Sequence, residues 1–386
     1  MNNIRKRSFT KTLFLTLALT FIASPVLALP PDPDNAALLY YQGFLTLAQL
    51  NDVARDRIGR VALGEMEPDD KVREDIVKCS GAIEFAEAAV KVPKCHWGIR
   101  YSQGFDALMP QLAQMRFLTF VLIADARAHA ADGDYKAALE RCLMAGIFAR
   151  HVGDDTMISY LVSIAVRGVS YKCMRDVMSR AAGDTELLQW LKMELAAAGP
   201  VNVSPVRPLK IEIEIVTDLM QMNNIKKLAR VMSDSDGKKA AEIVKKTDEK
   251  ILERARRIYS EYMNSALTVL STPTPFEQAH SRLKRMADVD QDDPVSMAVN
   301  FFTPALDKIL SQKTAVETHA NAIKAAIEIL LSHAGTAQLP DTLPAGLPKD
   351  AFSGQDFEYE KTKEGFVLRC PSENLDVYQY EFNIKK

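Results

Sequence analysis

The sequence has few of the residues that define several large classes of protein. Cysteine occurs 5 times in 386 residues, glycine 17 times and proline 18 times. This composition excludes a dense disulfide scaffold, a collagen-like repeat and long disordered segments. The 48 basic residues are balanced by 50 acidic ones, so the chain lacks the excess positive charge of a typical nucleic-acid-binding protein.

Motifs of nucleotide binding and of common catalytic sites are also missing. The chain has no Gly-x-x-x-x-Gly-Lys-Ser/Thr phosphate loop, no Gly-x-Ser-x-Gly elbow and no Gly-x-Gly-x-x-Gly fingerprint. Its histidines, at positions 96, 129, 151, 280, 319 and 333, do not have the spacing of zinc ligands on one helix. The sequence therefore predicts no cofactor, no metal and no identifiable catalytic residue.

One acidic stretch, Asp288–Pro294, resembles the start of a calcium-binding loop. The sixth position of the pattern is Asp293, where the sharp turn needs glycine, and the twelfth is Val299, where glutamate binds the ion. A solvated acidic loop is the favoured interpretation, and loose surface binding of calcium is the alternative.

The five cysteines are expected to be mostly small residues of the core. Because their number is odd, at least one has no disulfide partner within the chain. Cys79 and Cys95 are a candidate disulfide pair, and their spacing fits no metal site.

The N-terminus has the pattern of a cleaved export signal. A basic segment, Arg5–Lys11, precedes the apolar stretch Leu13–Ala23. That stretch is too short for a bilayer span of about 20 residues and fits the apolar part of a signal peptide. Small residues then predict cleavage between Ala28 and Leu29.

The route and destination of export follow from the same region. Lys6 stands where a twin-arginine signal has its first arginine, so the general secretory route is favoured. No cysteine follows the cleavage site, which argues against a lipid anchor. We expect a mature bacterial protein in the periplasm or outside the cell, with no stable membrane span and no nucleic-acid partner.

After the signal peptide (1–28), residues 29–199 are predicted to form helical hairpins. Asp34 or Asn35 can cap the first helix, and short Gly-Asp turns separate the later ones. Long amphipathic helices joined by such turns are typical of antiparallel hairpins. The expected helices cover about 36–50, 69–91, 104–131, 135–150, 157–181 and 186–198.

A second helical region, 200–335, follows a proline-rich boundary at Pro200 and Pro205–Pro208. Apolar spacing predicts helix over 209–270 and a last long helix over about 304–332. Lysines between 226 and 250 alternate with acidic residues and are expected to lie on a solvated face.

The period of the apolar residues changes after Gly335. Alternating residues in 357–360, 365–369 and 377–384 predict a small antiparallel sheet in a C-terminal module, 336–386. The predicted fold is mainly α, a stack of antiparallel helical hairpins closed by this β module.

Three resemblances accompany this pattern. The segment Gly133–Ala145, with Ala138, Cys142 and Ala145 at helix-contact positions, resembles half of a tetratricopeptide repeat. It implies a stacked helical hairpin. The preceding helix does not have the pattern of such a repeat, and no second copy follows.

The mature chain as a whole is similar to a group of exported proteins of planctomycete-type bacteria with no known activity. The similarity lies in the following segments: 35–41, Cys95–Gly98, 149–155, 158–162 and 347–355. It implies helical architecture and export, and nothing about chemistry.

The last 70 residues are similar to the helix-to-sheet junction of type II secretion pseudopilins, through the segment Pro348–Gly354 and a tyrosine-containing hairpin. This resemblance implies a helix capped by a hairpin. The chain departs from those proteins because its helix is internal and its N-terminus is not a prepilin leader.

Cys95-His96-Trp97 is the most suggestive cluster, with a thiol, an imidazole and a large aromatic ring together. Neighbours in sequence seldom face each other, so a nucleophile–base pair is disfavoured and a structural or interaction role is expected.

The favoured function is a non-catalytic scaffold that binds a protein or peptide of the cell envelope between its helices. A hydrolase or lyase on an α/α scaffold is the first alternative, and an accessory protein of a secretion system is the second.

Overall fold

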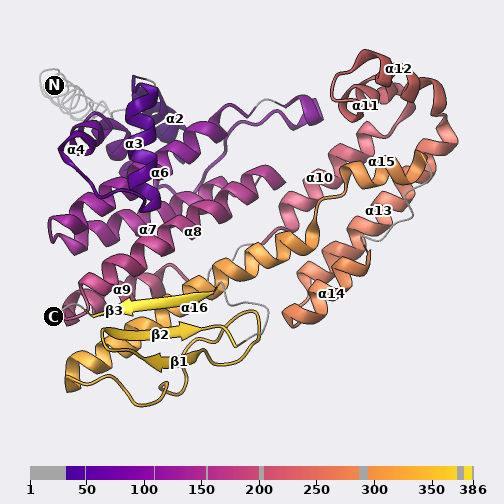
Figure 1. Ribbon diagram of the computed structural model, residues 1–386. Helices are drawn as coiled ribbons and strands as arrows, with labels where there is room; N and C mark the ends of the chain where they lie inside the picture. Colours follow the sequence, from indigo (N-terminus) through magenta and orange to yellow (C-terminus); the bar gives the residue numbers. More distant parts are fainter. Residues whose placement is uncertain are drawn as a thin grey trace, which may run out of the picture. The chain divides into compact units, whose positions relative to one another are not determined.

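The chain folds mainly into α-helices, with a three-stranded antiparallel sheet near the C-terminus, which confirms the predicted fold class (Figure 1). A computed structural model describes residues 32–47, 49–107, 109–153, 155–199, 204–286, 294–371 and 378–384. The predicted cleavage site at Ala28 and Leu29 and the acidic residues 288–293 lie outside these ranges. Within them, no helix is both long enough and apolar enough to cross a membrane.

Four helices, rather than the two expected, form the first part of the fold. They are α2 (Ala36–Leu47), α3 (Asp52–Leu63), α4 (Asp70–Val77) and α5 (Ser80–Ala89). The sequence reading missed α3, although Asn51 caps its start and Gly64 ends it with a φ of 76°.

The prediction of one helix over 69–91 was wrong, because the helix breaks at Lys78 and Cys79. Past the break, α5 packs against α2. A Cβ added to Gly43 would lie only 3.4 Å from the backbone of Ala82, so the two helices approach closely at a glycine.

The next four helices confirm the predicted hairpins: α6 (Gln111–Ala131), α7 (Tyr135–Val152), α8 (Met157–Arg180) and α9 (Thr185–Ala197). The side chains of Asp134, Thr156 and Asp184 accept hydrogen bonds from the first backbone N–H groups of α7, α8 and α9. The expected helical start at residue 104 was wrong, since a 3₁₀ turn at Tyr101–Asp106 precedes α6.

The region predicted as helix over 209–270 contains four separate helices. They are α10 (Val206–Leu219), α11 (Ile225–Met232), α12 (Gly237–Lys246) and α13 (Glu249–Ser271). Two helices that the sequence reading had missed follow, α14 (Phe276–Met286) and α15 (Pro294–Phe302). The long helix α16 (Leu306–Thr336) confirms the last predicted one.

Two buried clusters of apolar side chains share the helices α8 and α16. The first joins α2–α9 with the later part of α16 and the sheet. The second joins the start of α8 with α10, α11, α13–α15 and the earlier part of α16. Side chains of α8 are buried in both clusters, so this helix joins the two.

The sheet consists of β1 (Glu358–Lys361), β2 (Gly365–Arg369) and β3 (Gln379–Asn383), in the order β1-β2-β3. Both the sheet and the segment that precedes it contact α16. Thr318 donates a hydrogen bond of 3.1 Å to the fully buried Asp350, and His319 Nδ1 lies 2.8 Å from the Tyr380 hydroxyl.

Candidate binding site: a basic trough between α7 and α8

One candidate site is a pair of adjoining cavities along the groove between α7 and α8. The cavities have volumes of about 740 Å³ and 520 Å³ and share Ile147, Arg150 and Arg167 in their walls. We call this pair the basic trough. Cavities that bind small molecules typically measure about 300–1,000 Å³, so the trough has room for a larger ligand.

Helical spacing explains which side chains reach the trough. On α8, Tyr160, Ser163, Arg167 and Tyr171 line it at intervals of three or four residues, which places them on one face. On α7, Gly146 lines it with no neighbour within 4 Å of an added Cβ, so the groove stays open there.

Positive charge dominates the trough. The larger cavity is lined by Lys91, Lys94, Arg150 and Arg167, and no Asp or Glu occurs among its described lining residues. The smaller cavity adds Lys324 and one carboxylate, Glu194. A concave surface with charge of one sign concentrates ligands of the opposite sign.

Arg167 is the most unusual of these cations. Its side chain is nearly buried, with 9% of the residue exposed, and its Nε has no hydrogen-bond partner. Neither Arg167 nor Arg150 has an ion pair with a described carboxylate. Burial is the main cause that lowers the pKa of Arg167, and the charge of Arg150 adds to it.

The predicted cluster Cys95-His96-Trp97 forms part of one wall. Cys95 and His96 line the larger cavity. Trp97 is buried, stacks on Tyr40 at 5.5 Å between ring centroids, and donates a hydrogen bond of 2.7 Å to the backbone oxygen of His151. This segment therefore fixes the end of α7 against α2.

At neutral pH the Cys95 thiol is protonated and the His151 imidazole is neutral. Burial raises the pKa of the Cys95 thiol to about 12. Burial and the nearby Arg150 lower the pKa of His151 to about 4, and its Nδ1 lies 3.0 Å from the Tyr40 hydroxyl. At this helix end, desolvation therefore outweighs the helix dipole, which would favour a positive charge.

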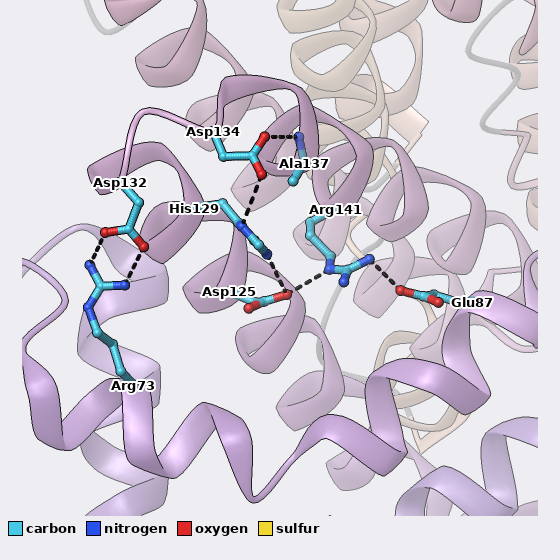
Figure 2. Close-up of polar contacts among 8 residues, drawn as sticks. All are labelled: Arg73, Glu87, Asp125, His129, Asp132, Asp134, Ala137 and Arg141. Carbon is cyan, nitrogen blue, oxygen red and sulfur yellow. Dashed lines mark hydrogen bonds and ion pairs between the residues drawn. The ribbon is translucent and has the colours of Figure 1, made fainter.

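A second polar cluster lies at the other end of the α6–α7 hairpin and is fully paired (Figure 2). Arg141 donates hydrogen bonds of 2.6 Å to Asp125 and of 2.6 Å to Glu87. His129 lies 3.7 Å from Asp125. Here each charge faces an opposite charge, as is typical of a structural network that joins helices.

In the described part of the chain, no group of three or more His, Cys, Asp or Glu side chains could hold a metal ion. All five cysteines, including the candidate pair Cys79 and Cys95, are free thiols in this structure. Four of the five are buried, at positions 79, 142, 173 and 370.

In the sequence analysis, Arg150 and Tyr160 lie within the segments 149–155 and 158–162, which carry only a resemblance. Arg167 was not predicted as a site residue. A usable signal was present on α8. Tyr160, Ser163, Arg167 and Ser170 recur at helical spacing between apolar residues, which places polar groups on a face that packs inward. What the spacing does not reveal is that Arg167 lacks a described carboxylate partner.

Comparisons with known proteins return no family, no curated protein and no solved structure that matches this chain.

Proposed function

We propose that the chain is a non-catalytic helical binding protein and that its basic trough receives an acidic segment of a polypeptide. The observation that carries the proposal is the charge of the larger cavity, whose described walls hold two lysines and two arginines but no carboxylate. A protein interior or cleft normally pairs its charges. Neither arginine of this cleft has an ion pair with a described carboxylate, so the cleft suits a ligand that brings the negative charge.

The extent of the trough favours a chain segment over a single small molecule. The lining residues of α8 run from Tyr160 to Met174. At 1.5 Å per helical residue, this length is about 21 Å. An extended peptide rises about 3.3 Å per residue, so about six residues fit along the trough.

The proposal includes the cell envelope as the site of binding. Its support is the predicted signal peptide, 1–28, since the partner of an exported protein is itself exported or displayed on the envelope. The resemblance to exported helical proteins points to the same compartment.

An enzyme of the hydrolase or lyase class is less well supported by the chemistry of the trough. Covalent catalysis needs a thiolate or a hydroxyl with a basic neighbour. Cys95 has a raised pKa of about 12, and the Nδ1 of His151 already lies against the Tyr40 hydroxyl. The Cys95 thiol is protonated at neutral pH, and the low pKa of His151 makes it a weak base, which favours binding as the function.

Charge reversal at one exposed lysine tests the proposal. The probe is a fluorescein-labelled peptide of twelve Glu, Gly and Ser residues, measured by fluorescence anisotropy with the full mature chain. Lys91→Glu changes a cation of the larger cavity, whereas Lys71→Glu changes an equally exposed lysine of α4 outside the trough.

We expect Lys91→Glu to weaken binding by about five- to tenfold and Lys71→Glu by less than about twofold, since one charge at a wet surface is worth about 1 kcal/mol. Binding should also weaken steeply with added salt. Equal effects of the two substitutions, or the same affinity for a Lys, Gly and Ser peptide, would contradict the proposal.

A further inference from the structure

Two buried hydrogen-bond donors without partners lie on the same face of α8. The hydroxyl of Tyr160 and the Nε of Arg167 have no hydrogen-bond partner, and the two residues are only 1% and 9% exposed. They are seven residues apart, which is close to two helical turns, and both line the larger cavity of the basic trough. Both residues therefore line the same cavity, and each has one buried polar atom without a partner.

Such groups are costly in a folded protein. A buried donor left without a partner costs about 1–3 kcal/mol, and the great majority of buried polar atoms are paired. Two exceptions in one cavity suggest a place that a ligand completes. The like charge of Arg150 at the same cavity adds to the cost while the trough is empty.

No described acid is paired with Arg167. Glu194 lines the smaller cavity together with Arg167, but it is exposed and has no described ion pair with this arginine. Glu317 is the acid whose charge reaches Tyr160, and its carboxylate accepts a hydrogen bond of 2.7 Å from Lys313. Asp155, a second and buried acid, has its Oδ1 atom 3.7 Å from Nη2 of Arg207. The acceptor for Arg167 must therefore come from outside these residues.

We propose that Arg167 and Tyr160 form an oxyanion subsite at the floor of the trough, and that this subsite takes one carboxylate group of the bound polypeptide. The inference rests on the proposed function. A guanidinium presents parallel N–H groups that match the two oxygens of a carboxylate, and a phenol adds a third donor.

The charge of the subsite favours a carboxylate over a phosphate. Only one guanidinium is buried, since Arg150 is exposed at the mouth of the cavity. A single negative charge balances it, whereas a phosphate dianion would leave a second charge desolvated without a buried partner. Arg150 is placed to attract the ligand, and Arg167 to hold it.

Substitutions with matched controls test the subsite. Arg167→Lys keeps the positive charge and removes the parallel N–H donors of the guanidinium, and Arg167→Met removes both the charge and the donors. Tyr160→Phe removes one partnerless hydroxyl of the trough. Its control is Tyr259→Phe, which removes an equally buried and partnerless hydroxyl in the second apolar cluster.

Three labelled twelve-residue peptides distinguish the source of the carboxylate. One has glutamates and an amidated C-terminus, one has only Gly and Ser with a free C-terminal carboxylate, and one has Gly and Ser with an amidated C-terminus. We expect Arg167→Met to weaken at least one of the two carboxylate-bearing peptides tenfold or more. The peptide that responds identifies a side-chain or a terminal carboxylate as the occupant.

We expect Arg167→Lys to weaken that peptide about fivefold and Tyr160→Phe about threefold or more, with Tyr259→Phe unchanged. Wild-type affinity in Arg167→Met, or equal effects of the two tyrosine substitutions, would overturn the subsite. If Lys91→Glu still weakens binding in that case, the trough remains a binding site and only the subsite fails. If Lys91→Glu has no effect either, both inferences fail.

Discussion

Replacing Arg167 with methionine is expected to make the unliganded protein more stable. In the free protein this guanidinium is 9% exposed, has no described carboxylate partner and lies in the same cavity as Arg150. Methionine is also long and unbranched, so it can fill much of the same space without a charge. Loss of a stabilising contact, the usual result of substitution at a buried position, is not expected here.

The size of the gain follows from the groups that are lost. The orphaned Nε alone carries a penalty of about 1–3 kcal/mol, and the hydrogen bond that the Tyr171 side chain makes with Arg167 offsets about 1 kcal/mol of it. A net gain of about 1 kcal/mol remains. For a chain of this length, we expect a rise in Tm of about 1–3 °C.

The assay compares Arg167→Met with Arg141→Met in the same thermal scan. Arg141 is also an arginine of the helical hairpins, but it binds Asp125, whose side chain is only 12% exposed. Its removal leaves a nearly buried carboxylate whose remaining described partner is the His129 imidazole, with the Nε2 atom at 3.7 Å. We expect a loss of about 2 kcal/mol and a lower Tm.

We therefore expect Arg167→Met to raise the Tm and Arg141→Met to lower it. A drop in Tm for Arg167→Met comparable to that for Arg141→Met would refute this reasoning, because Arg167 would then have a stabilising partner in the free protein. The same variants, titrated with the acidic peptide, should show the reverse order in binding.

Three further predictions concern other parts of the chain. Burial lowers the pKa of His319 from 6.5 to about 4, so between these pH values the unfolded chain binds more protons than the folded one. The free energy of unfolding should therefore fall by up to about 3 kcal/mol as the pH drops from 6.5 to 4. His319→Asn should flatten this pH dependence in urea unfolding. The fully buried thiols of Cys142 and Cys173 should resist iodoacetamide until the protein unfolds, and rapid labelling in the native state would contradict their burial. The intact mass of the protein expressed in its host should match a chain that begins at Leu29. A mass that includes Ala28 and the preceding residues would contradict the predicted export signal.

The sequence was most informative where structure depends on neighbouring residues. The starts of α7, α8 and α9 were predictable because Asp134, Thr156 and Asp184 cap them directly. The sheet was predictable because alternation in 357–384 differs from helical spacing. The break before α5 was not, since neither residue at the break, Lys78 or Cys79, is a glycine or a proline.

The basic trough was also beyond the reach of the sequence. Its cations come from the loop after α5, from α7, from α8 and from α16, and only the fold brings them to one groove. The burial of Arg167 could be guessed from the apolar residues around it on α8. The absence of a described carboxylate partner could not, because any of the many acidic residues elsewhere could have reached it.

Photo-crosslinking tests most directly whether the trough is where an acidic segment binds. The probe is the twelve-residue Glu, Gly and Ser peptide with a central benzoylphenylalanine, and crosslinked residues are mapped by mass spectrometry. We expect crosslinks on α7 and α8 at lining residues such as Ile147 and Tyr171, with a lower yield in Arg167→Met. Crosslinks that concentrate elsewhere, or that do not change in this variant, would contradict this expectation.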